Sequence, residues 1–175
     1  GYVHHLIKPT FGGRISRAQV IDILVDNVNS RNFGVECKAS RLNSLRLSTW
    51  FRHGGKGGQL ETESEFLRRA NRIGIAAVAM READSEAESP RIGAYLIPWN
   101  VVLMIGSREI TTTVLDSYVA DGFIYKLTTT DGTVWLPPRD KRIFRTLAEM
   151  DKMAEKTNEK LRAEHPKIPR SKKGR

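Results

Sequence analysis

The chain has 175 residues, of which 39% are hydrophobic and 28% are charged, and its formal net charge is +9. This composition is typical of a globular protein with a core of its own, and the basic balance indicates a polyanionic partner such as nucleic acid. A single cysteine excludes a disulfide framework and a multi-cysteine zinc site, and no apolar run is long enough to cross a bilayer. We therefore expect an intracellular protein, cytoplasmic or nucleoid-associated, that binds no membrane.

The length predicts one domain, over residues 1–165, followed by a basic and disordered tail over residues 166–175. Residues 1–19 are basic, contain glycine and lack acids, which indicates a lead-in segment or a phosphate-facing loop. Two apolar runs then predict strands near residues 20–26 and 33–39, joined by a turn-rich connection.

Basic and aromatic residues alternate over residues 40–58, which end in a glycine-rich loop. A helix follows: Thr62 and Glu65 fit a capping box, an apolar stripe at helical spacing extends to Ile73, and Gly74 stands where a C-cap belongs. The continuous apolar run at residues 75–80 predicts a strand that is covered on both faces.

An acidic stretch at residues 81–90 indicates a surface loop, and residues 92–97 read as a further strand. Residues 123–127 and 133–136 flank a turn and predict a late hairpin. Asp140 is placed to cap a long helix that ends before Pro166. This order predicts an α/β fold in which α-helices flank a mixed central β-sheet.

The chemistry-bearing residues lie on the first two predicted strands. Because side chains alternate along a strand, Glu36 and Lys38 share one face, while Cys37 points to the other and is expected to be a small buried hydrophobe. Asp22 interrupts an apolar run, where an acid requires a cation or metal partner if it is buried. The alternative interpretation of Glu36 and Lys38 is a solvated strand face with a weak ion pair.

Asp22 followed by Glu36-Cys37-Lys38, with Gln59 ahead of a helix and then the apolar strand at residues 75–80, resembles the PD-(D/E)xK nuclease superfamily. Within it, the pattern is most similar to Holliday-junction resolvases of the archaeal and RecU types, including phage versions. The resemblance implies a restriction-endonuclease-like fold and a metal-dependent endonuclease that resolves four-way DNA junctions by paired nicks.

The resemblance implies catalytic roles for Asp22, Glu36, Lys38 and Gln59. Asp22, Glu36 and the backbone carbonyl of Cys37 would hold Mg²⁺ or Mn²⁺, which activates water against a phosphodiester. Lys38 would orient the nucleophile or stabilise developing negative charge. Paired nicks imply a homodimer, whose interface we expect at residues 99–120 or on the helix at residues 140–163.

Basic residues outside this motif are expected to contact DNA phosphates: Arg14, Arg17, Arg41, Arg46, Arg52, Lys56, Lys172 and Lys173.

The chain departs from the resolvases at its N-terminal end. Resolvases of this kind carry an extra glutamate on an N-terminal helix, whereas residues 1–21 contain no acid. That residue lies upstream of Gly1, is lacking, or is replaced by Glu61, Glu63 or Glu65. The alternatives to a resolvase are another PD-(D/E)xK repair or restriction-like nuclease and a non-catalytic nucleic-acid-binding protein on the same fold.

Overall fold

The computed structural model describes most of the chain between residues 2 and 164. The described residues are 2–5, 10–11, 14–15, 21–26, 32–46, 58–82, 92–106, 109–127, 129–130, 133–134 and 143–164.

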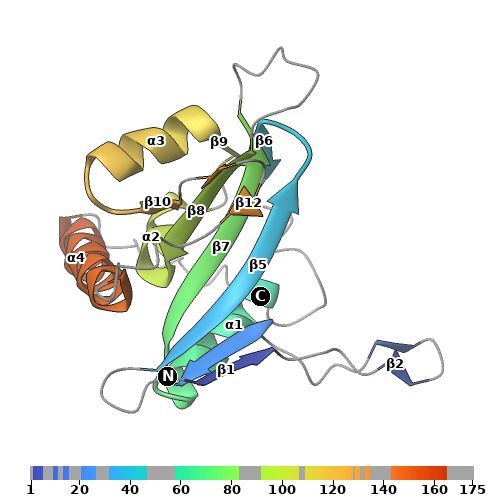
Figure 1. Cartoon of the computed structure of the whole chain (residues 1–175). Helices are drawn as coiled ribbons and strands as arrows, with labels where there is room; N and C mark the ends of the chain where they lie inside the picture. Colours follow the sequence, from blue (N-terminus) through green and yellow to red (C-terminus); the bar gives the residue numbers. More distant parts are fainter. Residues whose placement is uncertain are drawn as a thin grey trace, which may run out of the picture.

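A mixed β-sheet forms the centre of the protein (Figure 1). Strands β5 and β7 are parallel, and the other neighbouring strands of the sheet are antiparallel. The strand order β1-β4-β5-β7-β8-β10 confirms the predicted α/β class with a mixed central sheet. The body of the sheet consists of β4 (Ile23–Asp26), β5 (Phe33–Ser40), β7 (Ile73–Arg81), β8 (Ile92–Pro98) and β10 (Tyr125–Leu127), with β1 (Tyr2–His5) at the edge beside β4.

Short strand pairs lie outside this sheet, and two predictions about strands need correction. Residues 1–19 were predicted to be a lead-in segment or a phosphate-facing loop, yet β1 extends the central sheet. The predicted late hairpin is confirmed in part: residues 133–134 pair with residues 129–130, whereas residues 125–127, predicted as its first strand, pair with β8. The short pairs are β2 (Thr10–Phe11) with β3 (Arg14–Ile15), β6 (Ser44–Arg46) with β9 (Glu109–Thr111), and β11 (Thr129–Thr130) with β12 (Thr133–Val134).

Helices cover both faces of the sheet. Leu67 of α1 belongs to the same buried cluster as Ala76 of β7, whereas Leu147 of α4 belongs to the cluster of the neighbouring Ile75. Successive residues of a strand face opposite sides, so α1 and the first half of α4 pack on opposite faces. None of the described helices is long and apolar enough to cross a membrane. The described helices are α1 (Gln59–Arg69), α2 (Trp99–Ile105), α3 (Thr112–Ala120) and α4 (Ile143–Glu164).

Helix α1 begins and ends earlier than its sequence pattern predicts. Gly58 is the N-cap, and the carbonyl of Gly58 accepts hydrogen bonds from the backbone N–H and the hydroxyl of Thr62. The predicted capping box is therefore wrong, as is the C-cap at Gly74, which lies within β7. The chain turns at Asn71, whose φ of 50° is left-handed and ends the helix. The earlier start makes Gln59 the first residue of α1.

A pair of glycines allows α1 to approach the sheet closely. Gly34 of β5 and Gly74 of β7 are register partners, and both lie beneath Leu67. A Cβ atom at Gly34 would lie 2.7 Å from Leu67 Cδ2, and one at Gly74 would lie 2.5 Å from Leu67 Cδ1. Side chains at these positions would push the helix outward, so the glycine pair determines how near α1 lies to β5.

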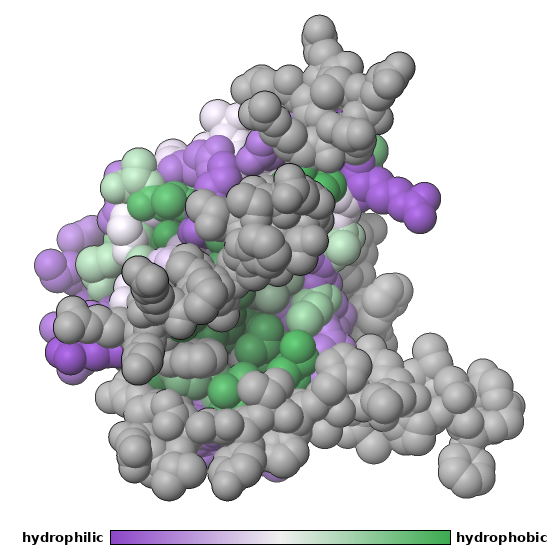
Figure 2. All heavy atoms as spheres, in the orientation of Figure 1, coloured by the Kyte–Doolittle hydropathy of each residue, from purple (hydrophilic) through white to green (hydrophobic). Residues whose placement is uncertain are grey.

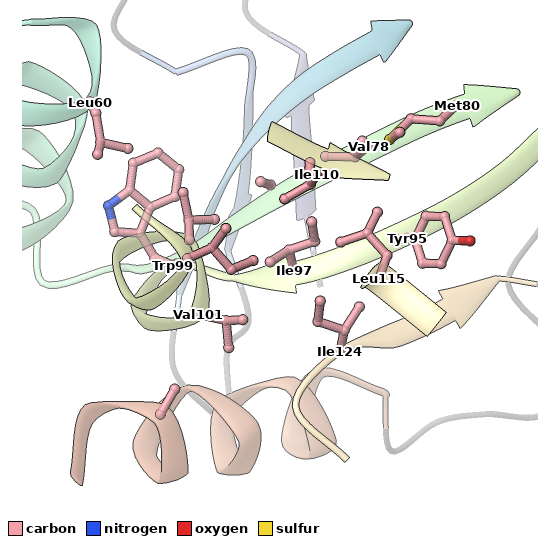
Figure 3. Close-up of a cluster of buried hydrophobic side chains, with 14 of the residues drawn as sticks. Leu60, Val78, Met80, Tyr95, Ile97, Trp99, Val101, Ile110, Leu115 and Ile124 are labelled. Atoms are coloured by element: carbon pink, nitrogen blue, oxygen red, sulfur yellow. The ribbon is translucent and has the colours of Figure 1, made fainter. Parts of the chain in front are cut away.

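Trp99, the first residue of α2, packs between α1 and the sheet. Its side chain faces Leu60 of α1 in the core (Figure 3), and only 6% of its surface is exposed. The indole Nε1 donates a hydrogen bond to Ser64 Oγ at 2.9 Å. This contact ties α1 to the start of α2 and stabilises the helix that carries Gln59.

Other predictions lie outside the described residues: most of the glycine loop, the acidic residues 83–90, Asp140 and the tail at 166–175. The long C-terminal helix is confirmed as α4.

Candidate active site

Asp22 lies one residue before β4, at the side of β5. Its Oδ2 accepts a hydrogen bond from the backbone N–H of Cys37 at 2.9 Å. The antiparallel register of β4 and β5 pairs Ile23 with Val35, so the residue preceding Ile23 lies beside the next part of β5. The half-buried Asp22 carboxylate is therefore beside the Glu36-Cys37-Lys38 segment, as the sequence predicts.

Glu36 and Lys38 form a close ion pair on the face of β5 that is covered by α1. Lys38 Nζ lies 2.5 Å from Glu36 Oε1. Glu36 is 3% exposed, which excludes the alternative interpretation of a solvated strand face. A buried carboxylate loses its hydration, so the ammonium and the hydrogen bonds that it receives offset a substantial desolvation cost.

Gln59 brings the start of α1 into contact with this pair. Its Nε2 donates hydrogen bonds to Glu36 Oε1 at 3.0 Å and to Glu63 Oε1 at 2.6 Å. Residues four apart in a helix lie on the same side, so Gln59, Glu63 and Leu67 share the face that packs on the sheet. Because Leu67 rests on the glycine pair, the preceding turns of α1 bring Glu63 and Gln59 towards Glu36.

Glu63 is the acid that the motif alone does not identify. It is 1% exposed, and burial, together with the negative charge of Glu36, raises its pKa to about 8. Among the acids weighed as replacements for the N-terminal glutamate, Glu61 is exposed and Glu65 pairs with arginines on the outside of α1. Glu63 is four residues from Gln59, so it lies on the same side of α1 as Gln59. This helical spacing is the sequence signal that distinguishes Glu63 from Glu61 and Glu65.

Cys37 points away from the pair, as the strand alternation predicts, but it is exposed, so the prediction of a buried hydrophobe was wrong. Small side chains, including Ala77 and Ala79, leave a pocket of about 340 Å³ at this face of the sheet. Figure 2 shows hydrophobic side chains gathered in the middle of the visible face. The pKa of Cys37 is raised mainly because the thiol is partly removed from water, and to a smaller extent because Asp22 and Glu36 are negatively charged.

The backbone of Cys37 contacts Asp22 at the β4 edge of β5. Within a strand, the N–H and C=O groups of one residue point in the same direction. Since the Cys37 N–H is directed at Asp22, its carbonyl lies on the same side of β5. Asp22, Glu36 and this carbonyl therefore supply oxygen atoms around one stretch of the strand.

This donor set fits a hard divalent cation. The described residues contain no group of three or more His, Cys, Asp or Glu side chains placed to hold a metal ion. Mg²⁺ commonly binds through one or two carboxylates and keeps several waters, so Asp22, Glu36 and a backbone oxygen form a suitable set. A cation would also offset excess negative charge, because Asp22 and Glu36 supply two carboxylates here and Lys38 supplies one positive charge.

The structure locates part of the predicted DNA-contacting set. Arg41 is exposed and follows β5 directly. Arg14 lies in β3 and Arg46 in β6. The remaining members of the set lie outside the described residues: Arg17, Arg52, Lys56, Lys172 and Lys173.

No family model and no curated protein matches the chain. The functional assignment therefore depends on the site geometry and on the resemblance of its motif.

Proposed function

We propose that this protein is a Mg²⁺- or Mn²⁺-dependent endonuclease that resolves four-way DNA junctions by paired nicks. The observation that supports this most strongly is the convergence of Asp22, Glu36, Lys38 and Gln59 on one part of β5, with Asp22 coming from the residue before β4 and Gln59 from α1. These are the residues at which the sequence resembles the PD-(D/E)xK nucleases. A solvated ion pair requires no such convergence.

Asp22, Glu36 and the Cys37 carbonyl would hold the cation. When bound, the cation lowers the pKa of a coordinated water and screens the phosphate charge. Asp22 is half-buried and hydrogen-bonded to the Cys37 N–H, so its carboxylate is oriented before any ligand arrives. The buried Glu36 carboxylate is oriented by Lys38 and Gln59.

Lys38 supplies positive charge where the phosphodiester would react. Its side chain is 25% exposed, whereas that of Glu36 is 4% exposed, so the ammonium lies between the buried acid and solvent. A fixed cation at this place stabilises negative charge that develops on the phosphate or orients the attacking water. In this proposal, Gln59 contacts Glu36 and keeps its carboxylate in place.

Affinity for DNA would come from the basic surface. The net charge of +9 favours phosphate contacts that do not depend on sequence. Arg41 is exposed and follows directly after the end of β5, three residues beyond Lys38. A four-way junction has two-fold symmetry, so paired nicks favour a homodimer with two such sites. A DNA substrate would fit a cytoplasmic or nucleoid-associated protein.

The test is cleavage of a labelled four-way junction beside a linear duplex of the same sequence, with Mg²⁺ or with chelator. We expect symmetric nicks on the junction alone, and we expect Asp22→Asn to abolish cleavage while junction binding persists. Asp121→Asn, at the exposed end of α3, is the matched control and should cleave normally.

Other outcomes would point to the competing functions. Cleavage of both substrates would indicate a repair or restriction-like nuclease of linear DNA. Tight junction binding without cleavage, at every concentration of Mg²⁺ and Mn²⁺, would indicate a non-catalytic binding protein.

A further inference from the structure

Glu63 has a buried carboxyl oxygen that the proposed reaction does not use. Its Oε1 accepts from Gln59 Nε2 at 2.6 Å, whereas its Oε2 has no hydrogen-bond partner among the described residues. The residue is 1% exposed. An acid at a buried position with an unsatisfied oxygen costs free energy relative to an apolar residue, which indicates a role beyond packing.

The contact with Glu63 determines which way the Gln59 amide points. An amide nitrogen carries two donors, and here they are directed at Glu63 Oε1 and Glu36 Oε1. In the reversed orientation, the amide oxygen of Gln59 would face two acceptors. Glu63 therefore holds the Gln59 nitrogen towards Glu36.

Gln59 in turn acts on the proposed ligand. Glu36 Oε1 receives a hydrogen bond from Gln59 at 3.0 Å and one from Lys38 at 2.5 Å. Two donors on the same oxygen restrict rotation of the carboxylate about its last bond. The orientation of Glu36 thus depends on a chain of contacts that begins at Glu63.

We propose that Glu63 is a positioning residue, which orients Glu36 through Gln59 for binding of a divalent cation. This inference rests on the proposed function. Glu63 contacts Gln59, and the described residues contain no group of three acids placed to hold a metal ion, so its action is indirect. Outer contacts that orient metal ligands typically contribute roughly 10-fold to 100-fold in metal affinity or activity.

Binding of Mn²⁺ to the full chain, measured by electron paramagnetic resonance, tests the inference. We expect Glu63→Leu to weaken Mn²⁺ binding by roughly 10-fold to 100-fold, because Gln59 loses its acceptor. Glu63→Gln retains a carbonyl oxygen that accepts from Gln59, so it should bind Mn²⁺ nearly as well as the parent chain. Glu155→Gln, at an exposed position of α4, is the control for a lost charge.

A double-variant cycle with Gln59→Leu separates an indirect role from direct ligation. If Glu63 acts through Gln59, then Glu63→Leu adds no further loss of Mn²⁺ affinity in the Gln59→Leu background. Additive losses would overturn the inference, and so would an equal loss in Glu63→Gln and Glu63→Leu, because both results indicate a charged ligand. Thermal unfolding of each variant identifies any that fails to fold. If Glu63→Leu does not fold, Gln59→Leu and Glu63→Gln decide: weakened Mn²⁺ binding by Gln59→Leu with nearly normal binding by Glu63→Gln supports the inference, and weakened binding by Glu63→Gln overturns it.

The proposed function fails in a different pattern. If the parent chain binds no Mn²⁺, or if Asp22→Asn binds it unchanged, the proposed cation site is wrong and the inference is overturned with it. If Asp22→Asn abolishes binding while folded Glu63→Leu binds like the parent chain, only the role of Glu63 is overturned.

Discussion

Asp22 and Cys37 are 15 residues apart in the chain and are joined by a hydrogen bond of 2.9 Å from the Cys37 backbone N–H to Asp22 Oδ2. The bond attaches an acid at the start of β4 to the middle of the Glu36-Cys37-Lys38 segment. Its donor is a backbone group, so this contact depends on strand register. Substitutions at Lys38 or Glu63 should therefore leave this hydrogen bond in place.

Replacing Lys38 tests its assignment to charge stabilisation. Lys38→Met should slow junction cleavage by roughly 100-fold or more, because a fixed cation next to the phosphate is lost. It should also destabilise the protein by about 1–3 kcal/mol, since Glu36 remains buried without its ammonium partner. Single-turnover cleavage and urea unfolding measure the two effects.

The double variant Glu36→Gln/Lys38→Met removes both charges together. It should recover stability relative to Lys38→Met while remaining inactive. Recovery of cleavage in this double variant would contradict the assigned roles.

Substitution of Glu63 should alter the pH dependence of stability. Its pKa is raised from 4.5 to about 8, mainly by burial, so the folded protein retains a proton that the unfolded chain has released between these pH values. The contribution of Glu63 to the free energy of unfolding is therefore most favourable below about pH 4.5, and it decreases as the pH rises towards about 8.

Glu63→Gln does not titrate, so its stability relative to the parent chain should increase across this window, by about 1.4 kcal/mol per pH unit at most. Urea unfolding with chelator at several pH values measures this difference. Glu61→Gln, at an exposed position, controls for the lost charge. A pH-independent difference for Glu63→Gln would show that the carboxyl group ionises normally.

Gly34→Ala tests the close approach of α1 to the sheet. The added methyl group would lie 2.7 Å from Leu67 Cδ2, so it should destabilise the protein by about 1–3 kcal/mol and move Gln59 away from Glu36. Leu67→Ala creates space at the same point, so the double variant should lose less than the sum of the two single variants. Strictly additive losses in urea unfolding would contradict this packing.

Binding to a junction should weaken steeply with salt. Phosphate contacts release counterions, so the logarithm of the affinity should fall linearly with the logarithm of the salt concentration. Arg41→Gln should reduce the slope by about 1 if the exposed Arg41 contacts a phosphate. Fluorescence anisotropy measures the slope, and a flat salt titration of the parent chain would contradict the role of the basic surface.

Cys37 should react with a thiol reagent in the folded protein. Its side chain is exposed, so one equivalent of Ellman's reagent should be consumed without denaturant. Because its pKa is raised above the ordinary value of a thiol, the reaction should be slow near neutral pH and accelerate as the pH increases. Cys37→Ser is the blank, and reaction only in urea would show that the thiol is inaccessible.

Local sequence patterns predicted the parts of the fold that depend on nearby residues. Strand alternation placed Glu36 and Lys38 on one face and Cys37 on the other, and this was confirmed. The sequence predicted β5 and β7 closely, and the continuous apolar run of β7 is typical of a strand in the interior of a sheet. The helix after Gln59 was predicted from its periodicity, with errors at its ends, where hydrogen bonds of the cap decide the boundary.

The sequence by itself determined the order β4, β5, α1, β7, β8 and α4 and the candidate set of Asp22, Glu36, Lys38 and Gln59, whereas it predicted neither β1 nor the helices α2 and α3. Only the tertiary structure decided that β1 pairs at the sheet edge, that Glu63 and not Glu61 or Glu65 faces Glu36, and that Cys37 is exposed. These features depend on which surfaces meet across long separations in the chain. The position of α1 on the sheet depends on the packing of Leu67 over Gly34 and Gly74, which no local sequence pattern predicts.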